Sequence, residues 1–489
     1  MPLNGKLFLE VDSMRKKFLS VVLVSTMAAS LLAGCGGKDD ETKKANNDTT
    51  KKTEETGTKG GEDTTAAPAG DAKIEAPSTD GWDDSKKIYA YSWDDDFSKK
   101  LGVVLDKFPE YKDYVEFVTL GVSGTGDEYK QGIKDALEGD KYPTFIPADN
   151  DVAKYFSEDD SITMDLGELG ITEDMLANSY DFAKQYGKFG DKLKCMTWQG
   201  CPGSVFYRRD IAKEVLGTDD PEKVQEAMAD WDKFFETADK LKAAGYKITS
   251  GPDDVKYAIW DSQTQPCVNV ADDGSETLQL DDAVKDYFET GKKLYDGGYT
   301  NNTSLWSQDG AWAAGQKSDS KVFCYFCCPW MVGVMQGNGA TDGDWGAITG
   351  PTSYHWGGTY VSVGKDTNNK ELAAFLLYEL TCDPDIAVEI TNKTGDFCNN
   401  KAANERLTTG GELAADNAAM KFLGGQNPIE AWAKAAEGIS QANVTYADAS
   451  IKAFIDDAAK SYNAGELKTV DEAVEFVEKK CDSDLHIGK

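Results

Sequence analysis

The chain has 489 residues and a formal charge of −33 at pH 7. Nucleic acid is a poor partner for so acidic a protein, because its phosphates would be repelled. The chain contains only two histidines, His355 and His486, which leaves little for a catalytic triad and nothing for a multi-histidine metal site. We interpret both histidines as structural or surface residues.

The first element along the chain is a bacterial lipoprotein signal. A basic triplet at residues 15–17 precedes an apolar run over residues 18–34, which ends directly before Cys35. Basic residues hold the start of such a segment in the cytoplasm, and small residues before the cysteine admit the processing peptidase. The run is short and contains serines, so it is a weak membrane span. We therefore expect a signal peptide over residues 1–34, with Met14 as its true start, and lipid (palmitate) on Cys35.

Residues 35–80 have the composition of a disordered tether. From Gly36 to Asp80 there is no aromatic residue, and Ile74 is the only large aliphatic one. Such a stretch cannot bury enough apolar surface to offset the entropy of ordering it, and its mixed charges keep it solvated. We expect it to hold a folded body at the extracellular face of the cell membrane.

The first part of the body alternates strand-like and helix-like patterns. The expected elements are strands over residues 87–93, 114–120 and 144–147, and helices over residues 97–108 and 129–137. This order predicts a mostly parallel sheet with helices on both faces, whose ligands bind beyond the carboxyl ends of the strands. Two polar groups fall at such ends: Trp93 with Asp94 and Asp95, and Asp149 with Asn150.

The second part of the body continues the alternation. Its expected elements are strands over residues 204–207, 321–328 and 345–348, and helices over residues 224–241, 372–380 and 451–458. Asn369 is a candidate cap for the helix that follows it, and Asp383-Pro384 has the pattern of an N-cap followed by proline at the first helical position.

The cysteines favour neither a metal site nor a defined disulfide. Nine of the ten cysteines follow Cys35, so at least one is unpaired in a monomer. The group at residues 324–328 lies in an expected buried strand, whose alternation points Cys327 away from its two neighbours. We interpret these residues as small apolar core residues. A disulfide between Cys195 and Cys201 stays open at this point.

Several segments, taken in order, resemble the family 1 extracellular solute-binding proteins, the carbohydrate-binding, maltose-binding-protein-like group. The resemblance covers the body from about Lys87 to the C-terminus. It is carried by Ile88-Tyr-Ala-Tyr-Ser-Trp93-Asp94, Tyr142-Pro-Thr-Phe-Ile-Pro-Ala-Asp149-Asn150, Met196-Thr-Trp198-Gln199-Gly-Cys-Pro202-Gly203-Ser-Val-Phe-Tyr207-Arg208-Arg209-Asp210, Pro329-Trp330, Gly350-Pro-Thr-Ser-Tyr354-His-Trp356-Gly357-Gly358-Thr359, Asn369-Lys-Glu-Leu-Ala-Ala-Phe and Thr394-Gly395-Asp396-Phe397.

The resemblance implies an α/β fold of type II, with two lobes that close on a ligand about a hinge. Each lobe would hold a mixed, mostly parallel sheet flanked by helices. The chain would cross between the lobes near Trp198–Gly203, Trp356–Val361 and Asn399–Asn404. Lobe one would comprise residues 87–199 plus 362–400, and lobe two residues 203–355 plus 405–489.

The loops between these lobes carry the residue types that a sugar needs. A sugar ring has an apolar face and a rim of hydroxyls, so its receptor needs flat aromatic rings, carboxylates and amides. The expected ligand-binding residues are Trp93, Asp94, Asp95, Asp149, Asn150, Trp198, Gln199, Trp330 and Trp356. The resemblance assigns a ligand-binding position best to Trp330 and to the Trp93-Asp94 pair. The match is weaker for Trp306 and Trp312. For each tryptophan, a place in the core is an equally good interpretation.

The resemblance implies a monomeric, lipid-anchored binding protein without enzymatic activity or cofactor. It would capture a carbohydrate outside the cell and pass it to the permease subunits of an ABC importer. One alternative is a secreted glycoside hydrolase, which needs two carboxylates that flank the scissile bond. The other is a binding protein for a non-sugar solute. A charged solute would need Lys or Arg in the cleft loops, which hold only Arg208 and Arg209, and these look structural.

Overall fold

The computed structural model describes residues 72–261, 263–271 and 273–489, which all belong to one compact unit. The expected signal peptide, the start at Met14, the lipidation site Cys35 and the tether up to residue 71 lie outside the described residues. Within the described ranges, no helix combines the length and the apolar character that crossing a membrane requires.

The last residues of the expected tether lie against the body. Residues 72–79 form no helix or strand. The Tyr111 hydroxyl nevertheless donates a 2.7 Å hydrogen bond to the Pro77 carbonyl, and Ile74 packs on the hydrophobic core. The large aliphatic side chain of this segment therefore fixes its end to the body, which differs from the expectation of a free tether as far as residue 80.

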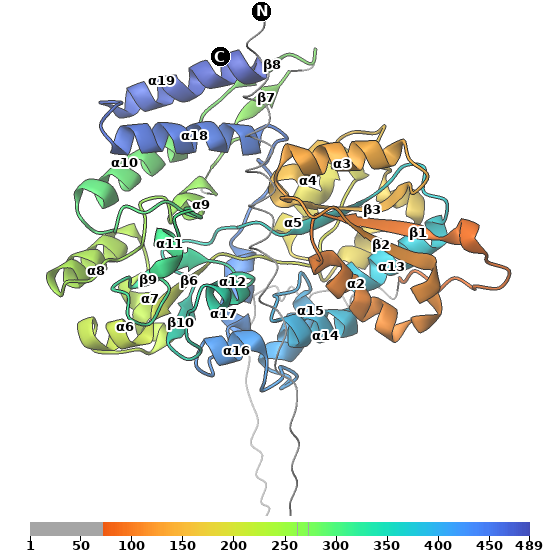
Figure 1. Ribbon diagram of the computed structural model, residues 1–489, viewed down its shortest axis with the longest axis horizontal. Helices are drawn as coiled ribbons and strands as arrows, with labels where there is room; N and C mark the ends of the chain where they lie inside the picture. The colour runs from red at the N-terminus through yellow and green to blue at the C-terminus, as the bar shows by residue number, and fades with distance from the viewer. Residues whose placement is uncertain (1–71, 262, 272) are drawn as a thin grey trace, which may run out of the picture. The chain divides into compact units, whose positions relative to one another are not determined.

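The first sheet has four strands in the order β11-β3-β1-β2 (Figure 1). Its strands are β1 (Ile88–Ser92), β2 (Val115–Thr119), β3 (Pro143–Asp149) and β11 (Thr359–Val363). The pairs β1–β2 and β1–β3 are parallel and β3–β11 is antiparallel, so the sheet is mixed and mostly parallel, as predicted.

Helices cover both faces of this sheet. Because successive strand residues point to opposite faces, Ile88 and Ala90 lie in one apolar cluster and Tyr91 in another. The first cluster includes α2 (Asp96–Lys107), and the second includes α3 (Asp127–Leu137) and α4 (Asn150–Ser157). Burial on two faces is what a largely parallel sheet requires.

The second sheet has the order β10-β6-β9. Its strands are β6 (Ser204–Arg208), β9 (Cys324–Cys327) and β10 (Trp345–Ile348). Both ladders are antiparallel, and Val322, two residues before β9, makes an isolated parallel bridge with Lys247. The expectation of a mostly parallel sheet is therefore wrong for this half of the body, since hydrophobic runs alone do not fix strand direction. We call the parts around the first and second sheets lobe one and lobe two.

Three chain segments lie side by side between the two sheets. Isolated bridges pair Met196 with Val361, Pro202 with His355, and Gln199 with Cys398. The Asn399 N–H donates to the Trp198 carbonyl at 2.7 Å, and the Trp356 N–H donates to the Cys201 carbonyl at 3.2 Å. The resemblance implies crossings at residues 198–203, 356–361 and 399–404, which we call the first, second and third crossings. These contacts join the three segments to one another.

The remaining elements surround these sheets. Helices α10, α18 and α19 lie beside one another at the top of the view in Figure 1. The further helices are α5 (Asp181–Gly187), α6 (Arg209–Val215), α7 (Pro221–Ala227), α8 (Trp231–Ala243), α9 (Lys256–Trp260), α10 (Asp282–Asp296), α11 (Ala311–Ala314), α12 (Met331–Gly337), α13 (Lys370–Cys382), α14 (Pro384–Thr394), α15 (Lys401–Thr408), α16 (Ala418–Phe422), α17 (Ile429–Glu437), α18 (Asp448–Asn463) and α19 (Val470–Lys480). Two short hairpins are formed by β4 (Lys188–Phe189) with β5 (Lys192–Leu193), and by β7 (Val268–Val270) with β8 (Glu276–Leu278).

Side-chain caps begin two of the helices at boundaries that were expected from the sequence. Asn369 accepts the Leu372 N–H at 3.2 Å, and Asp383 accepts the Ile386 N–H at 2.9 Å, which confirms both predicted caps. The long helix expected over residues 224–241 is instead two helices, α7 and α8. Asp230 accepts the Lys233 N–H at 2.7 Å and so caps a new helix inside the apolar stripe.

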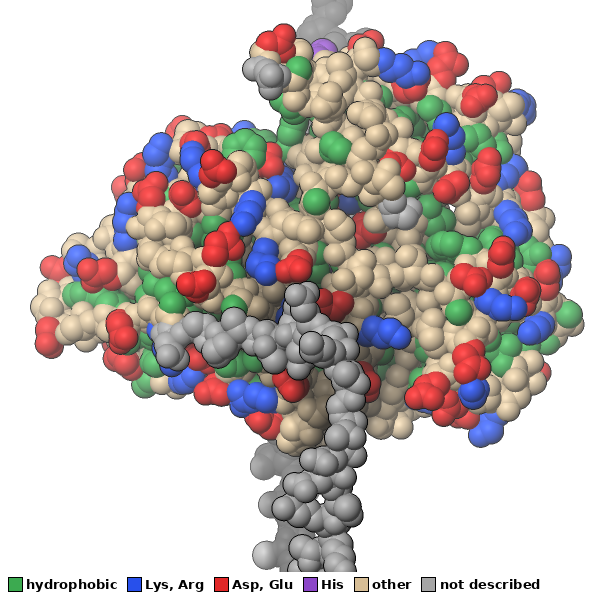
Figure 2. Space-filling view, turned by 180° about the vertical axis from the view of Figure 1, so that it is seen from behind, with side chains coloured by type: hydrophobic (Ala, Val, Ile, Leu, Met, Phe, Trp, Pro, Cys, Tyr) green, Lys and Arg blue, Asp and Glu red, His purple; other side chains and the backbone are tan. Residues whose placement is uncertain are grey.

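The cysteines of the described residues are all buried and free, so no disulfide joins Cys195 to Cys201. On the surface, acidic and basic side chains are interspersed over the face that Figure 2 shows. Many of them form exposed ion pairs one helical turn apart, such as Lys99 with Asp95 at 2.7 Å. Pairs of this kind contribute little to stability individually.

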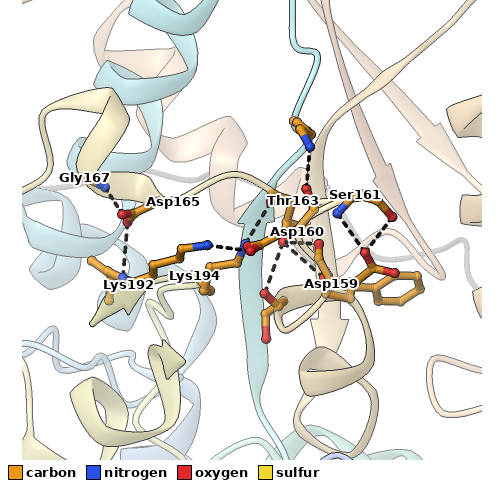
Figure 3. Close-up of polar contacts among 12 residues, drawn as sticks. Asp159, Asp160, Ser161, Thr163, Asp165, Gly167, Lys192 and Lys194 are labelled. Atoms are coloured by element: carbon orange, nitrogen blue, oxygen red, sulfur yellow. Dashed lines mark hydrogen bonds and ion pairs between the residues drawn. The ribbon is translucent and has the colours of Figure 1, made fainter. Parts of the chain in front are cut away.

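A buried lysine anchors the segment that enters the first crossing (Figure 3). The Lys194 ammonium group donates to an Asp160 carboxylate oxygen at 2.9 Å and to the Thr163 carbonyl at 2.8 Å. Lys192 also pairs with Asp160, and the two lysines lower the pKa of Asp160 to about 2. The Asp165 carboxylate accepts the Leu193 N–H at 3.2 Å. These contacts hold residues 192–194 in place before the chain crosses to lobe two.

Candidate functional site

Four aromatic residues of lobe two and the second crossing form what we call the tryptophan cluster: Trp306, Trp330, Trp356 and Tyr257. The rings of Trp306 and Trp330 are nearly parallel, at 11° and 6.2 Å between centroids. Trp330 meets Trp356 edge to face at 5.2 Å, and Tyr257 stacks on Trp356 at 4.7 Å. The cluster therefore presents several aromatic surfaces in one place.

The end of β9 positions Trp330. The strand ends at Cys327, and Trp330 then serves as the N-cap residue of α12. Its indole N–H donates to the Trp356 carbonyl at 3.2 Å. Gly357, at φ 71°, passes close by, because a Cβ added there would lie 3.5 Å from the Trp330 ring. The ring is thus fixed against the backbone of the second crossing.

The tryptophans differ in what they offer to a ligand. Trp306 is 44% exposed and has φ 59°, a left-handed conformation that is rare for a bulky residue. Trp330 is half-buried, whereas Trp356 is 5% exposed. Trp312 is buried, and its indole N–H donates to Asp254 at 2.6 Å, so it is a core residue. Strained residues cluster at functional sites, and within the tryptophan cluster Trp306 and Trp330 are the two tryptophans that are more exposed than Trp356.

Trp93 and its acidic neighbours lie at the carboxyl end of β1, as predicted. The half-buried Trp93 ring meets Tyr129 edge to face at 5.6 Å. It also lies against Gly124, where a Cβ would come within 2.7 Å of the ring. Asp94 and Asp95 are both exposed. Their carboxylates are therefore accessible at this edge of lobe one.

Asp149 and Asn150 bring the edge of the first sheet to the second crossing. Asp149 pairs with Thr359 in the β3–β11 ladder, and the Asn150 N–H donates to the Gly358 carbonyl at 2.9 Å. Burial, with a contribution from the neighbouring Asp151 carboxylate, raises the pKa of Asp149 to about 7. The Asn150 side-chain oxygen is buried and has no hydrogen-bond partner among the described residues. Their partners Thr359 and Gly358 are two and one residues along the chain from Gly357, which lies close to the Trp330 ring.

The structure gives Trp198 and Gln199 another role. Trp198 is 1% exposed and packs on Phe97 with 5.7 Å between ring centroids, so its ring offers no face to a ligand. The Gln199 oxygen accepts the Thr359 N–H at 2.9 Å, and its amide N–H donates to Asp396 at 3.1 Å. Both residues join the three crossings to one another.

A lysine that sequence analysis did not single out faces this region. Lys452 on α18 lies 3.6 Å from Asp151 at the start of α4, and its ammonium lies over the rings of Tyr257 and Trp260. Lys452 lies outside the cleft loops considered from the sequence, in which Arg208 and Arg209 are the only cations. Lys452 comes from a helix far along the chain, and no local sequence signal indicates that it meets α4.

The two arginines are structural, as expected. Arg208 is 2% exposed, and its guanidinium donates to the Lys317 and Ser318 carbonyls at 3.1 and 2.7 Å. The Arg209 guanidinium donates to the Trp345 carbonyl at 2.8 Å and to the Leu423 carbonyl at 2.8 Å. Neither is placed to bind a charged solute.

The described residues contain neither an arranged metal-binding group nor an exposed histidine at the crossings that could act as a general base. In those ranges no group of three His, Cys, Asp or Glu side chains is arranged to hold a metal ion. His355 is buried, and burial lowers its pKa to about 3, so the imidazole is neutral near pH 7. The Asp261 carboxylate accepts the backbone N–H of His355, which fixes the second crossing to the end of α9.

We expect Asp261 to make stability fall as the pH rises. Burial, only partly offset by Lys452, raises its pKa from 3.8 to about 7. A carboxyl with a raised pKa stabilises the folded state fully below its unfolded pKa, and this contribution is lost as the pH rises through the folded pKa. The Asp261→Asn amide can still accept the His355 N–H but cannot ionise. Thermal melts should therefore show the Tm of this variant, relative to wild type, increasing from about pH 4 to about pH 8.

The exposed Asp273 provides a control whose pKa is shifted in the opposite direction. Hydrogen bonds from Ser275 lower its pKa, so its contribution is present at higher pH and is lost as the pH falls. The relative Tm of Asp273→Asn should therefore stay nearly constant from about pH 4 to about pH 8, because the Asp273 contribution is lost only below its unfolded pKa of 3.8. A relative Tm of Asp261→Asn that does not change with pH would contradict a raised pKa in the folded protein.

The comparisons with known proteins agree with this architecture. The family described as bacterial extracellular solute-binding protein matches residues 104–421, which is more than half of the chain. No curated protein matches the chain in sequence. Among solved structures, an extracellular solute-binding protein of family 1 is 18% identical with a TM-score of 0.65, covering 81% of this chain and 98% of its own.

Two similar structures have sugars bound. The ABC transporter associated binding protein from B. animalis subsp. lactis Bl-04, in complex with beta-1,6-galactobiose, is 18% identical with a TM-score of 0.62, and the match covers 83% of this chain and 100% of that one. The galacto-N-biose-/lacto-N-biose I-binding protein from Bifidobacterium longum, in complex with lacto-N-biose, is 16% identical with a TM-score of 0.63 and the same coverage. At these identities the likeness establishes the fold, and it confirms the predicted two-lobe α/β type II class. The family match, over more than half of the sequence, shows that the chain belongs to the bacterial extracellular solute-binding proteins.

Proposed function

We propose that this solute-binding protein captures a sugar or oligosaccharide between its two lobes and delivers it to an ABC importer. The observation that carries the proposal is the tryptophan cluster beside the polar end of β3. Trp306 and Trp330 have accessible aromatic faces, which suit the apolar face of a sugar ring. Asp149 and Asn150 supply acceptors for its hydroxyls nearby.

Within this proposal the ligand-binding residues are Trp93, Asp94, Asp95, Asp149, Asn150, Trp306 and Trp330, with Trp356 supporting Trp330 from behind. The lobes would comprise residues 87–199 plus 362–400, and residues 203–355 plus 405–489. Lipid on Cys35 would anchor a monomeric protein to the outer face of the cell membrane, next to the permease subunits. The sugars bound by the two bifidobacterial structures support the class of ligand.

We expect a bound oligosaccharide to make the protein more compact. A ligand that contacts both lobes binds the closed state more tightly and shifts the population toward it. A thermal-shift screen of mono- and oligosaccharides identifies the ligand, because a ligand at a hundredfold its Kd stabilises the folded state by about 2.7 kcal/mol. Small-angle X-ray scattering with that ligand should then show a smaller radius of gyration.

Mixtures of amino acids and of dipeptides are tested in the same thermal-shift screen, for comparison with the sugars. If only those mixtures raise the melting temperature of the protein, its ligand is an amino acid or a peptide and not a sugar. An unchanged radius of gyration at saturating sugar would contradict binding between the lobes. Chromatography of the incubated oligosaccharides completes the test, since the appearance of hydrolysis products would favour a glycoside hydrolase instead.

A further inference from the structure

A hollow in lobe two, distinct from the accessible faces of Trp306 and Trp330, has the features of a binding site. Its walls come from the loop at residues 302–304 and from helices α10 and α18. Its water-accessible volume is about 110 Å³, and it is partly open to solvent. A smaller hollow adjoins it, because Tyr287 and Asp456 line both.

An unpaired amide oxygen lies in the wall of the hollow. Asn463, the last residue of α18, is 9% exposed, and its side-chain oxygen has no hydrogen-bond partner among the described residues. A buried acceptor without a hydrogen-bond partner is unfavourable. The side chain is therefore suited to accept a hydrogen bond from a group that enters the hollow.

Two carboxylates, Asp253 and Asp456, line the hollow. Both carboxylate oxygens of Asp253 accept the Leu305 N–H, at 3.0 and 3.2 Å, and a carboxylate can accept about four hydrogen bonds in all. Asp456 accepts the Tyr287 hydroxyl at 3.3 Å and pairs with Lys256 at 2.9 Å. Because Lys256 balances Asp456, and Lys460 lies in the same wall, the hollow does not select a cation by charge.

The other walls are aromatic. The rings of Tyr287 and Tyr295 line the hollow beside Pro252 and Ala459. A ligand that fits has hydroxyls to donate to Asn463 and Asp253 and an apolar face for the tyrosine rings. A single sugar ring has both, and it is neutral, as the balanced charges of the hollow require.

We propose that this hollow is a second carbohydrate site, built wholly within lobe two, which holds one sugar ring against Tyr295 and Asn463. The proposal relies on the proposed function only for the class of ligand. Since lobe one contributes no residue to the walls, a monosaccharide would bind here without closure of the lobes. The protein would then respond differently to single rings and to oligosaccharides.

Saturation-transfer NMR titrations with glucose, galactose, mannose and xylose test the site directly. Ala464 lies exposed at the C-terminal cap of α18 and in the wall of the hollow, so the ring of Ala464→Phe should fill the hollow while the protein still folds. Ala244 is a matched control, because it is an exposed residue at the C-terminal cap of α8 with the same helical conformation. We expect at least one pyranose to bind wild type saturably, with a Kd that rises at least about tenfold in Ala464→Phe and stays unchanged in Ala244→Phe.

The outcomes separate the second site from the proposed function. Asn463→Asp keeps an acceptor at the same place and should retain the monosaccharide, whereas Asn463→Leu should lose it. The radius of gyration of Ala464→Phe, measured by small-angle X-ray scattering, should still decrease when the oligosaccharide identified by the screen is added. If the wild-type protein does not become more compact with the oligosaccharide, the proposed binding between the lobes is contradicted. The second site is not, because it is tested by the monosaccharide titrations. The second site would be overturned if none of the four pyranoses binds saturably. It would also be overturned if Trp330→Ala loses this binding and Ala464→Phe keeps it.

Discussion

Replacing Trp330 by alanine should weaken sugar binding about tenfold to a hundredfold, which corresponds to about 1–3 kcal/mol, by analogy with other aromatic stacking platforms. The half-buried indole is held by its hydrogen bond to the Trp356 carbonyl and by the nearby Trp306 ring, so it is preorganised before a ligand arrives. Its removal deletes the stacking surface at the place where the second crossing meets β3. Isothermal titration with the sugar found in the screen measures the loss.

Folding should change less than binding in Trp330→Ala, since a ring with one accessible face leaves no closed cavity when it is removed. Trp345 provides the comparison with a fully buried ring. It is 0% exposed in β10 and stacks on Phe422 at 6.2 Å, so Trp345→Ala should lose about 3–5 kcal/mol of stability. A Trp330→Ala protein that melts as early as Trp345→Ala, yet binds sugar normally where it is folded, would place Trp330 in the core instead.

Local patterns account for the parts of the fold that were predicted. β1, β2 and β3 each coincide with an apolar run between turn residues, and Asn369 and Asp383 form the caps that their positions indicate. These features depend on neighbours within a few residues of the chain. The break at Asp230 is also local, but the apolar stripe continues through it, so periodicity alone joins α7 to α8.

The candidate site depends on contacts that no local pattern contains. Trp198 and Trp330 have the same side chain, yet Trp198 is 1% exposed and Trp330 is half-buried. Trp198 packs on Phe97, a residue that lies about one hundred positions before it in the chain. Lys452 meets Asp151 across three hundred residues, and only the packing of α18 near α4 brings the two together.

The three crossings are joined to lobe one by a buried ion pair between Lys100 and Asp396. Lys100 on α2 is 3% exposed and Asp396 is 5% exposed. Burial opposes the charge on Lys100, but Asp396 and Asp96 outweigh it and raise its pKa. Asp396 also accepts the Gln199 amide at 3.1 Å, and Gln199 binds Thr359. One ionic contact therefore supports α2 and the first, second and third crossings together.

Lys100→Met should lower the free energy of unfolding by about 3–5 kcal/mol, because it leaves the Asp396 carboxylate buried without its partner. Lys99 is the matched control, since it directly precedes Lys100 in the same helix and the side chains of its pair with Asp95 are 61% and 68% exposed. Lys99→Met should therefore lose no more than about 1 kcal/mol in urea denaturation. Adding Asp396→Asn to Lys100→Met removes the unpaired charge but keeps an acceptor for Gln199, so the double variant should be more stable than Lys100→Met alone. If Lys100→Met is as stable as Lys99→Met, the crossings are held by their backbone pairing and packing, and the ion pair contributes no net stability.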